Sequence, residues 1–445
     1  MPTLALSMIV RNAAPHLRAC LESVSGLADE IHIADTGSTD ATIPIAQDMG
    51  ARVISIAWEN DFARARNRAL EGVTTDWVLS LDADEQLDAS ASHYLPGLLS
   101  QRQVMGYLTP IRNYVLSLRD RVWDRPAVPN DTTLDTAKKY PAYVDHENVR
   151  LFRRSPQIHF VGRVHETVGA CIEKLGGKLS PSPLLIHHFG LVADAETRTQ
   201  KNHLYREMGR QKLRELPEDG QAHFELGLVE FDNFHNYEEA RRLFCRACEI
   251  NPGLSVSWFF AGMAYLQLGK PAEALKYLRN AGKRPPVSEA MGDAFYGLSE
   301  FEQARRWYLR AFTGDQVPPD LESKIGLAEV RSGRVTWGLA RLRQAVEREP
   351  GEPQLHDRLI TTLIWLGEIE AAAEAAERKV QDVAPDPQSY LRAAVIRARQ
   401  NDWHRSLEIL GSGLTQFPHH QGLERVLAEV LPQSRTAAVP AAKNL

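Results

Sequence analysis

Three carboxylates stand within four residues directly after an apolar stretch of the chain. Asp82, Asp84 and Glu85 follow residues 77–81, which read Trp-Val-Leu-Ser-Leu. Such a run predicts a buried β-strand, and open α/β sheets bind ligands at the carboxyl ends of their strands. Because side chains alternate along an extended chain, Asp82 and Asp84 are expected to point to the same side. Two carboxylates in this arrangement can share a divalent cation that neutralises a diphosphate, although a plain polar turn could have the same composition.

Polar residues also follow two other predicted strands, at residues 4–10 and 31–34. Arg11 and Asn12 come after the first of these strands, and Asp35 opens a polar segment after the second. In a series of right-handed strand–helix–strand units, such strand ends lie side by side. The three polar segments together could therefore contact the base, the ribose and the diphosphate of a nucleotide.

Strands and helices alternate at short intervals in this part of the chain. The pattern predicts helices at residues 16–24, 42–49, 61–70 and 86–103, and strands at 4–10, 31–34, 52–56, 73–81 and 104–110. Alternation of this kind predicts an α/β domain whose parallel sheet is covered by helices on both faces.

The glycine-rich motifs with which dinucleotide enzymes and P-loop NTPases bind phosphates do not occur in the sequence. Phosphates would then have to be bound in another way, and a cation on Asp82 and Asp84, helped by an arginine, is a suitable substitute. The predicted helix at 61–70 offers Arg64, Arg66 and Arg68. An exposed helix face would explain the same three residues.

Four segments resemble a known family. Residues 6–12, 33–40 and 79–85 resemble family-2 glycosyltransferases of the GT-A fold, and residues 58–67 resemble a branch of that family that often carries tetratricopeptide repeats. The resemblance covers about the first 200 of the 445 residues. It implies an enzyme that transfers a sugar from a nucleotide-diphosphate sugar, with a UDP-sugar favoured.

The resemblance also implies roles for individual residues. Asp35 would contact the nucleotide base and Asp82 the ribose or the metal, while Asp84 would hold Mn²⁺ or Mg²⁺ between the two phosphates. The residues expected near the nucleotide are Arg11, Arg66 and Asn67.

Residues 145–154 and 160–167 resemble a further pair of segments in that family. Sugar transfer of this kind needs a base that takes the proton of the acceptor as it attacks the anomeric carbon. Glu166 is the first candidate for this base, and Asp145 and Glu147 are the alternatives. A carboxylate that orients a loop arginine would explain Glu166 equally well.

His187 and His188 end the strand that we expect after residue 184. Because of the alternation along a strand, only one of them can face the site. The resemblance implies His188, as the third protein ligand of the metal beside Asp82 and Asp84, and an imidazole with two carboxylates suits Mn²⁺. A strand-end histidine bonded to the backbone is the alternative.

Two further segments of the first half are expected near the site. Residues 114–143 contain no clear periodicity, and we interpret them as an irregular flap on the acceptor side. A basic helix face follows the last strand, and it either approaches the diphosphate or is simply solvated; its residues are Arg198, Lys201, Asn202 and Arg206.

The second half of the chain repeats itself. Small residues recur at intervals of 34 or 30 positions, and an apolar or aromatic residue follows each of them after four positions; the small residues are Ala240, Ala274, Ala304, Gly338, Ala372 and Ser406. This period and the proline that closes most units follow the tetratricopeptide pattern. We therefore expect about six repeats that form a concave binding surface.

These patterns divide the chain into four parts. Residues 1–195 are predicted to form the GT-A glycosyltransferase domain, 196–219 a connecting helix, 220–430 the all-α tetratricopeptide superhelix, and 431–445 a disordered tail. The repeats are expected to bind a protein partner, and they also offer a surface for homo-oligomers.

The composition limits the remaining possibilities. Hydrophobic residues make up 43% of the chain, charged residues 24%, and the formal net charge is -5, without a polybasic block. We therefore expect no nucleic acid as a partner. Four scattered cysteines, the lack of a signal-peptide pattern and the lack of an apolar run long enough for a transmembrane segment predict a cytoplasmic protein, which includes a position at the inner face of the membrane.

The predicted function is that of an inverting, metal-dependent glycosyltransferase. The acceptor could be a peptide or protein side chain, since some relatives modify Ser, Thr or Cys of peptides, or it could be a glycan in lipopolysaccharide or surface-polysaccharide assembly. A different class remains open, namely a non-catalytic repeat scaffold that senses a nucleotide-sugar. The combination of Asp82, Asp84, His188 and Glu166 favours the enzyme.

Overall fold

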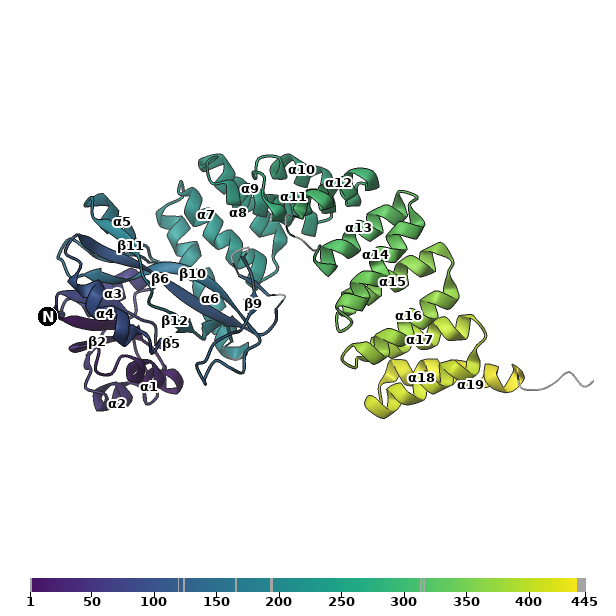
Figure 1. Ribbon diagram of the computed structural model, residues 1–445, viewed down its shortest axis with the longest axis horizontal. Helices are drawn as coiled ribbons and strands as arrows, with labels where there is room; N and C mark the ends of the chain where they lie inside the picture. Colours follow the sequence, from purple (N-terminus) through teal and green to yellow (C-terminus); the bar gives the residue numbers. More distant parts are fainter. Residues whose placement is uncertain are drawn as a thin grey trace, which may run out of the picture. The chain divides into compact units, whose positions relative to one another are not determined.

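The computed structural model describes residues 2–118, 120–122, 125–164, 166–192, 195–312, 314 and 317–437. The chain forms two compact units that divide between Asn236 and Tyr237 (Figure 1). The first unit is built around a mixed β-sheet, and the helices of the second unit follow one another in pairs.

The main sheet of the first unit has the strand order β3-β2-β1-β4-β10-β6-β12-β5. Its first four strands are parallel to one another, as the sequence predicts. They are β1 (Leu4–Val10), β2 (Glu30–Asp35), β3 (Arg52–Ser55) and β4 (Trp77–Ser80). The predicted strands at 4–10, 31–34 and 52–56 are thus confirmed within a residue or two, and the strand predicted from residue 73 begins only at Trp77.

The two faces of this sheet carry separate cores. On one face, even-numbered residues of β1 such as Leu6 and Met8 pack with helices α1 (Ala14–Ser23), α2 (Thr42–Asp48) and α4 (Ala91–Ser100). On the other face, Ala5 and Val78 pack with α3 (Phe62–Leu70) and α5 (Gly169–Lys174). A strand that is covered on both faces must be apolar at consecutive positions, which is the pattern from which the α/β class was predicted. The helices found on both faces of the sheet confirm this class.

The second half of the sheet departs from the all-parallel prediction. β10 (Ala142–Arg153) runs antiparallel to β4, and β6 (Val104–Val115) runs antiparallel to β10. β12 (Ile186–His188) joins β6, and β5 (Glu85–Leu87) pairs with β12 at the edge. β5 takes the start of the region that we expected to be helical, so the helix predicted at 86–103 is shortened to α4.

Residues 114–143 are more ordered than the predicted irregular flap. β6 extends to Val115 and β10 begins at Ala142, and between them lie the short strands β7 (Arg121–Val122), β8 (Arg125–Pro126) and β9 (Val128–Pro129). Tyr114 and Tyr143 form a buried cluster with Ala137 and with Phe189, just after β12. The segment therefore packs against the end of β12. Arg119 and Trp123, which belong to the predicted flap, lie outside the described residues.

Residues 160–167 contain an isolated bridge between Val161 and Thr167, and His165 lies outside the described residues. β11 (Lys178–Pro181) pairs with the first half of β6, and the short helical turn η1 (Gly190–Val192) follows β12.

The predicted connecting helix is present as α6 (Ala195–Glu215). It is followed by α7 (Gly220–Leu228) and by the π-helical turn η2 (Val229–Asn233), which also belong to the first unit. The buried carboxylate of Glu230 in η2 accepts from Arg206 of α6 at 2.7 and 2.8 Å and from Arg210 at 3.3 Å. The two compact units therefore divide after Asn236, within the range predicted for the repeat array.

The second unit confirms the predicted repeat register. Its helices are α8 (Tyr237–Ile250), α9 (Ser255–Gln267), α10 (Pro271–Leu278), α11 (Pro285–Gly297), α12 (Phe301–Ala311), α13 (Pro319–Arg331), α14 (Val335–Arg348), α15 (Pro353–Leu366), α16 (Ile369–Asp382), α17 (Pro387–Arg399), α18 (Trp403–Gln416) and α19 (Gln421–Ala437). Each predicted small residue lies buried on an even-numbered helix from α8 to α18, and so does the residue four positions later. Small residues allow paired helices to approach closely.

The disordered tail was predicted to start at residue 431, but the last helix extends to Ala437. Residues 431–437 belong to α19, and residues 438–445 lie outside the described residues. A search of the described residues finds no helix that has both the length and the apolar character needed to cross a membrane.

Candidate functional site

The loops that follow β1 and β2 are joined by side-chain hydrogen bonds at the carboxyl ends of the parallel strands. The backbone N–H of Asn12 donates to Ser38 Oγ at 2.9 Å, and Asn12 Oδ1 accepts from the Thr39 N–H at 2.8 Å. Asp35 is buried, and its carboxylate accepts from the N–H groups of Gly37 and Ser38, each at 3.0 Å. The predicted meeting of these strand ends is therefore found, with Arg11 exposed beside them.

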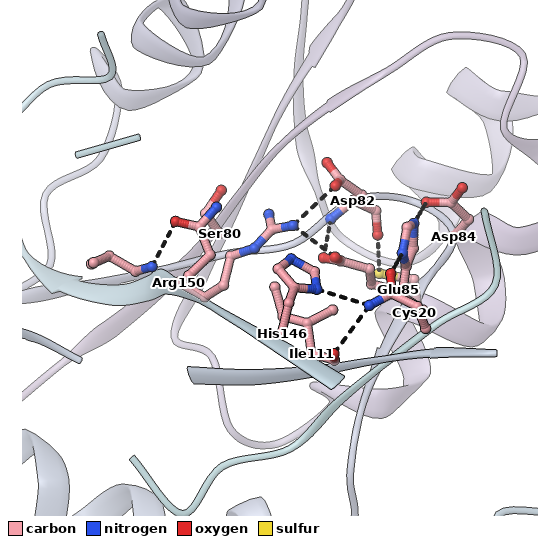
Figure 2. A network of polar contacts seen from close by, with 12 residues as sticks. Cys20, Ser80, Asp82, Asp84, Glu85, Ile111, His146 and Arg150 are labelled. Atoms are coloured by element: carbon pink, nitrogen blue, oxygen red, sulfur yellow. Dashed lines mark hydrogen bonds and ion pairs between the residues drawn. The ribbon is translucent and has the colours of Figure 1, made fainter. Parts of the chain in front are cut away.

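Asp82 and Asp84 do not share one side of the chain as we predicted. β4 ends at Ser80, and the chain turns at once, with the Glu85 N–H donating to the carbonyl of Asp82 at 3.0 Å. The alternation of an extended strand does not apply within a turn. Figure 2 shows that the two aspartates accordingly meet different partners.

Asp82 is held by two arginines. Arg66 of α3 donates to Asp82 and, at 3.1 Å, to Ser80 Oγ, while Arg150 of β10 lies 3.1 Å from the other Asp82 oxygen. Burial opposes ionisation of Asp82, but the two guanidinium groups outweigh it and lower the pKa of its carboxyl group. Asp82 is therefore an anion that is already neutralised by protein cations.

Glu85 completes this network from below Asp82 (Figure 2). Its side chain is fully buried, its Oε1 accepts from Arg150 at 2.7 Å, and its Oε2 accepts from the Asp82 N–H at 2.8 Å. Burial, reinforced by the charge of Asp82, raises the pKa of Glu85 despite the nearby Arg150. The carboxylate thus serves to position Arg150 and the turn at Asp82.

Asp84 faces a different set of groups. Its Oδ1 lies 3.6 Å from His188 Nε2, and its Oδ2 lies 3.2 Å from the ammonium of Lys201 on α6. Burial opposes ionisation of Asp84 as well, but His188 and Lys201 lower the pKa of its carboxyl group. The basic helix face that follows the last strand therefore reaches the site through Lys201.

The space between Asp84 and His188 is open because residue 190 has no side chain. A Cβ atom at Gly190 would lie 2.6 Å from His188 Nε2 and 3.0 Å from Asp84 Oδ2. A cation, here the ammonium of Lys201, already lies on one side of this space. A carboxylate and an imidazole with room between them fit a first-row divalent ion.

The predicted set of three ligands is only partly assembled. Over the described ranges, no three His, Cys, Asp or Glu side chains are grouped so as to hold a metal. Asp84 and His188 face one another, whereas Asp82 is turned to its arginines. Two protein ligands are sufficient for Mg²⁺-type sites, in which substrate phosphates and water supply the remaining oxygens. Binding of Mn²⁺ or Mg²⁺ stays a prediction.

The choice between the two histidines follows from their partners. His187 is 1% exposed, and its ring nitrogens lie 2.7 Å from the hydroxyl of Tyr114 and 3.1 Å from Asp88 Oδ2. Both nitrogens of His187 are therefore occupied within the fold. His188 points to the other side of β12, where its Nε2 faces Asp84.

Glu166 lies in the same network as Asp82. Its Oε1 accepts from Arg66 Nε at 2.5 Å, so Arg66 connects the candidate base to the end of β4. This contact matches the alternative in which Glu166 orients an arginine, and the role of base stays a prediction. Asn67 makes two hydrogen bonds with the backbone of Phe160, at 2.8 and 2.9 Å, and is thus bound to the fold rather than turned to a nucleotide.

Asp145, the alternative base, lies on the other face of the sheet. It pairs with Arg112 of β6 at 3.3 Å, and Arg112 is the register partner of His187. Because register partners point to the same face, Asp145 and Arg112 lie opposite the face that carries His188. Glu147, two residues further along β10, shares the face of Asp145 and is exposed.

Sequence reasoning gave no role to several residues of this site. Arg150 belongs to a segment that carries the family resemblance, but the register of β10 shifts between Val149 and Leu151, so alternation along the strand could not indicate where its side chain points. Asn113 lies beyond the end of the strand predicted at 104–110, so nothing in the pattern could have indicated it. Its contact with His188 exists only because β6 continues to Val115.

Comparison with known proteins assigns both units to families. Residues 6–158 match the model of glycosyl transferase family 2, and residues 259–319 match a tetratricopeptide repeat. The first unit therefore carries a family-2 glycosyltransferase domain, and the second is a tetratricopeptide-repeat domain, as the resemblance predicts.

Individual relatives cover parts of the chain. A TPR repeat-containing protein of Synechococcus elongatus is 30% identical over 235 residues, which are 51% of this chain and 52% of that protein. The SPbeta prophage-derived glycosyltransferase SunS of Bacillus subtilis is 26% identical over 167 residues, or 37% of this chain and 34% of that protein. The chain thus spans about half or less of the length of these relatives.

Solved structures of repeat proteins are also similar to this chain. A tetratricopeptide repeat protein from Parabacteroides merdae is 12% identical, with a TM-score of 0.41, and the match covers 53% of this chain and 94% of that one.

Proposed function

We propose that this protein is an inverting glycosyltransferase that uses a nucleotide-diphosphate sugar as donor and a divalent cation, Mn²⁺ or Mg²⁺, as cofactor. The observation that carries the proposal is the open space between Asp84 and His188 at the carboxyl end of β4, within a family-2 glycosyltransferase domain. Relatives that are named glycosyltransferases support the same reaction class.

The cation would be held by Asp84 and His188 and, when bound, would offset the negative charge that develops on the departing diphosphate. Lys201 would then be released from Asp84, and its ammonium would bind a phosphate oxygen of the donor. Asp82 would keep its orientation through Arg66 and Arg150 and would accept hydrogen bonds from the ribose.

In the transfer step, the acceptor nucleophile forms a bond to the anomeric carbon while the bond from that carbon to the diphosphate oxygen breaks. The proton of the nucleophile passes to a carboxylate, for which we propose Glu166. Arg66 engages its Oε1, so Oε2 is the oxygen that would take the proton. The products are a glycosylated acceptor of inverted configuration and a nucleoside diphosphate.

We further propose a peptide or protein acceptor, because tetratricopeptide arrays bind polypeptides on their concave surface. A glycan acceptor in lipopolysaccharide or surface-polysaccharide assembly is the alternative, with the repeats recruiting a protein partner. A UDP-sugar is the first donor to test. A scaffold that only senses a nucleotide-sugar would bind the donor without turnover.

A thermal-shift screen of UDP-, GDP-, TDP- and ADP-sugars, each with and without Mn²⁺, tests the donor and the cation together. We expect one nucleotide class to raise the unfolding temperature, and to do so more strongly with Mn²⁺. Release of the nucleoside diphosphate with that donor then separates an enzyme from a sensor.

The matched variants are Asp84→Ala and Asp145→Asn. Asp84→Ala should abolish the Mn²⁺-dependent shift and the release of nucleoside diphosphate, with the fold retained, whereas Asp145→Asn should change neither. Unchanged release by Asp84→Ala would remove the proposed cation site.

A further inference from the structure

A buried amide lies behind His188. Asn113 of β6 is 1% exposed, and its Nδ2 donates to the backbone carbonyls of Val144, at 3.0 Å, and Ile111, at 3.2 Å. Only the NH₂ group of an asparagine can donate to a carbonyl oxygen. These two backbone contacts therefore fix which end of the amide points to His188, and that end is the oxygen.

The orientation of the amide determines where His188 carries its hydrogen. Asn113 Oδ1 lies 2.7 Å from His188 Nδ1, and an amide oxygen can only accept a hydrogen bond. His188 Nδ1 must then carry the hydrogen. A neutral imidazole has one N–H, so His188 Nε2 is left with a free electron pair.

A second ring is consistent with this assignment. Asn113 Nδ2 also lies 2.8 Å from His146 Nδ1. The NH₂ group has two hydrogens for these three acceptors, so one hydrogen is shared, and because Nδ2 cannot accept, His146 Nδ1 has the role of acceptor. Burial, together with the charge of Arg150, lowers the pKa of His146 to about 4, so this nitrogen is unprotonated and able to accept near neutral pH. One amide thus connects two histidines, with opposite hydrogen-bond roles at their Nδ1 atoms.

We infer that Asn113 is a positioning residue that holds His188 in the Nδ1–H form, with the Nε2 electron pair directed at the space beside Asp84 and Gly190. His188 Nε2 lies 3.6 Å from Asp84 Oδ1, and a Cβ atom at Gly190 would enter the space beside these two groups. Groups that bind the far nitrogen of a ligating histidine fix its ring and its tautomer. The use of this nitrogen for a cation rests on the proposed function, whereas the tautomer does not.

Nuclear magnetic resonance of the full-length protein, labelled with ¹⁵N in histidine, measures the tautomer directly. The spectra are taken over a series of pH values, and the tautomer is determined from those in which the ring nitrogens have the shifts of a neutral imidazole. Comparison with the His188→Gln variant identifies the signals of His188. We expect a protonated Nδ1 and an unprotonated Nε2 in the wild-type protein. A protonated Nε2 would overturn the inference without any variant.

Two substitutions on β6 test whether Asn113 causes this preference. Asn113→Leu has a similar volume but no acceptor, and it should shift His188 toward the Nε2–H form. Thr109→Val removes another buried polar group of β6 that does not contact His188, and it should leave the tautomer unchanged. An Nδ1–H form that persists in Asn113→Leu would overturn the role of Asn113.

Calorimetry with Mn²⁺ alone gives the second measurement. Asn113→Leu should weaken Mn²⁺ binding by about 10- to 100-fold, which is the usual effect of removing such a partner, and Thr109→Val should not. Equal Mn²⁺ affinity of Asn113→Leu and the wild-type protein would contradict the inference. If the wild-type protein binds no Mn²⁺, the cation of the proposed function fails, while the tautomer measurement still decides the role of Asn113.

Discussion

Arg66 and Glu166 stand 100 residues apart in the sequence, and Arg66 Nε donates to Glu166 Oε1 at 2.5 Å. The same guanidinium binds Asp82, so the proposed base and the end of β4 share one buried cation. The arginine fixes the direction of the Glu166 carboxylate relative to the strand end. A general base must first lie within hydrogen-bond distance of the proton that it takes, and only then does its proton affinity determine the rate.

Glu166→Gln is the sharpest test of this base. The amide has the same shape and its oxygen can still accept from Arg66, but it cannot take a proton. We expect kcat to fall by about 10²- to 10⁴-fold, the usual contribution of general base catalysis, with donor affinity and thermal stability nearly unchanged. Asp145→Asn serves as the control and should retain turnover, because Asp145 lies on the other face of the sheet. Full turnover by Glu166→Gln would leave Glu166 only the role of orienting Arg66.

Arg150 is predicted to be a structural cation. Its side chain lies between Asp82 and the fully buried Glu85, so Arg150→Met would leave a buried carboxylate without its partner. Removing one member of a buried ion pair costs about 3–5 kcal/mol. Native-state hydrogen exchange of the β4 amides measures this loss locally. Adding Glu85→Gln should restore part of the stability, because the double variant no longer carries an unpaired buried carboxylate at position 85. A double variant that is no more stable than Arg150→Met would contradict the structural role of Arg150.

The sequence was sufficient for the parallel direction of the first four strands and for the repeat register, because both follow from the pattern of apolar residues. Alternation along β12 predicted that only one of His187 and His188 faces the site, and the family resemblance, not alternation, implied His188. Sequence reasoning failed at Asp82 and Asp84, where the chain turns after Ser80 and alternation ends. It indicated Lys201 only as one member of a basic helix face, and it could not reveal Asn113 beside His188, because these contacts join segments whose pairing no local pattern specifies.

Glu30 predicts an acid-sensitive contribution to stability. Its carboxylate accepts from the Thr74 N–H at 3.2 Å and lies 2.8 Å from His32 Nε2, and the hydrogen bond from the Thr74 hydroxyl lowers the pKa of Glu30 to about 2. A depressed folded pKa stabilises the fold fully above the ordinary value of 4.5, and this stabilisation is lost as the pH falls toward 2. Thermal midpoints of Glu30→Gln should lie below wild type at pH 7 and converge with it near pH 2. A difference between Glu30→Gln and wild type that is as large at pH 2 as at pH 7 would contradict this prediction.

Replacing glycine by alanine should lower the free energy of unfolding at one position of the repeat array and raise it at another. A Cβ at Gly338 of α14 would lie 2.5 Å from the carbonyl oxygen of Gly326 on α13, so Gly338→Ala must push the two helices apart. Such overpacking costs about 1–3 kcal/mol. A Cβ at Gly411 of α18 would meet no atom within 4 Å, and Gly411→Ala should stabilise the helix by about 1 kcal/mol. Urea unfolding of both variants measures the difference, and destabilisation by both would contradict the proposed close approach of α13 and α14.

Removal of the repeats tests whether they serve the acceptor. The cut belongs after Asn236, because α7 and η2 are part of the first unit and Glu230 of η2 is the partner of Arg206 and Arg210. A chain that ends at 236 should bind the nucleoside diphosphate with nearly the full-length Kd, measured by calorimetry, since Asp84, His188 and Lys201 all belong to the first unit. Its turnover of a peptide acceptor should fall by at least about tenfold through a raised KM, because an extended acceptor that binds two units loses the effective concentration that the second unit provides. A parallel loss of donor affinity and acceptor use would instead show that the array stabilises the catalytic domain. A second truncation after residue 219 removes Glu230, the partner of Arg206 and Arg210, and shows how donor affinity and turnover change when the first unit itself is destabilised.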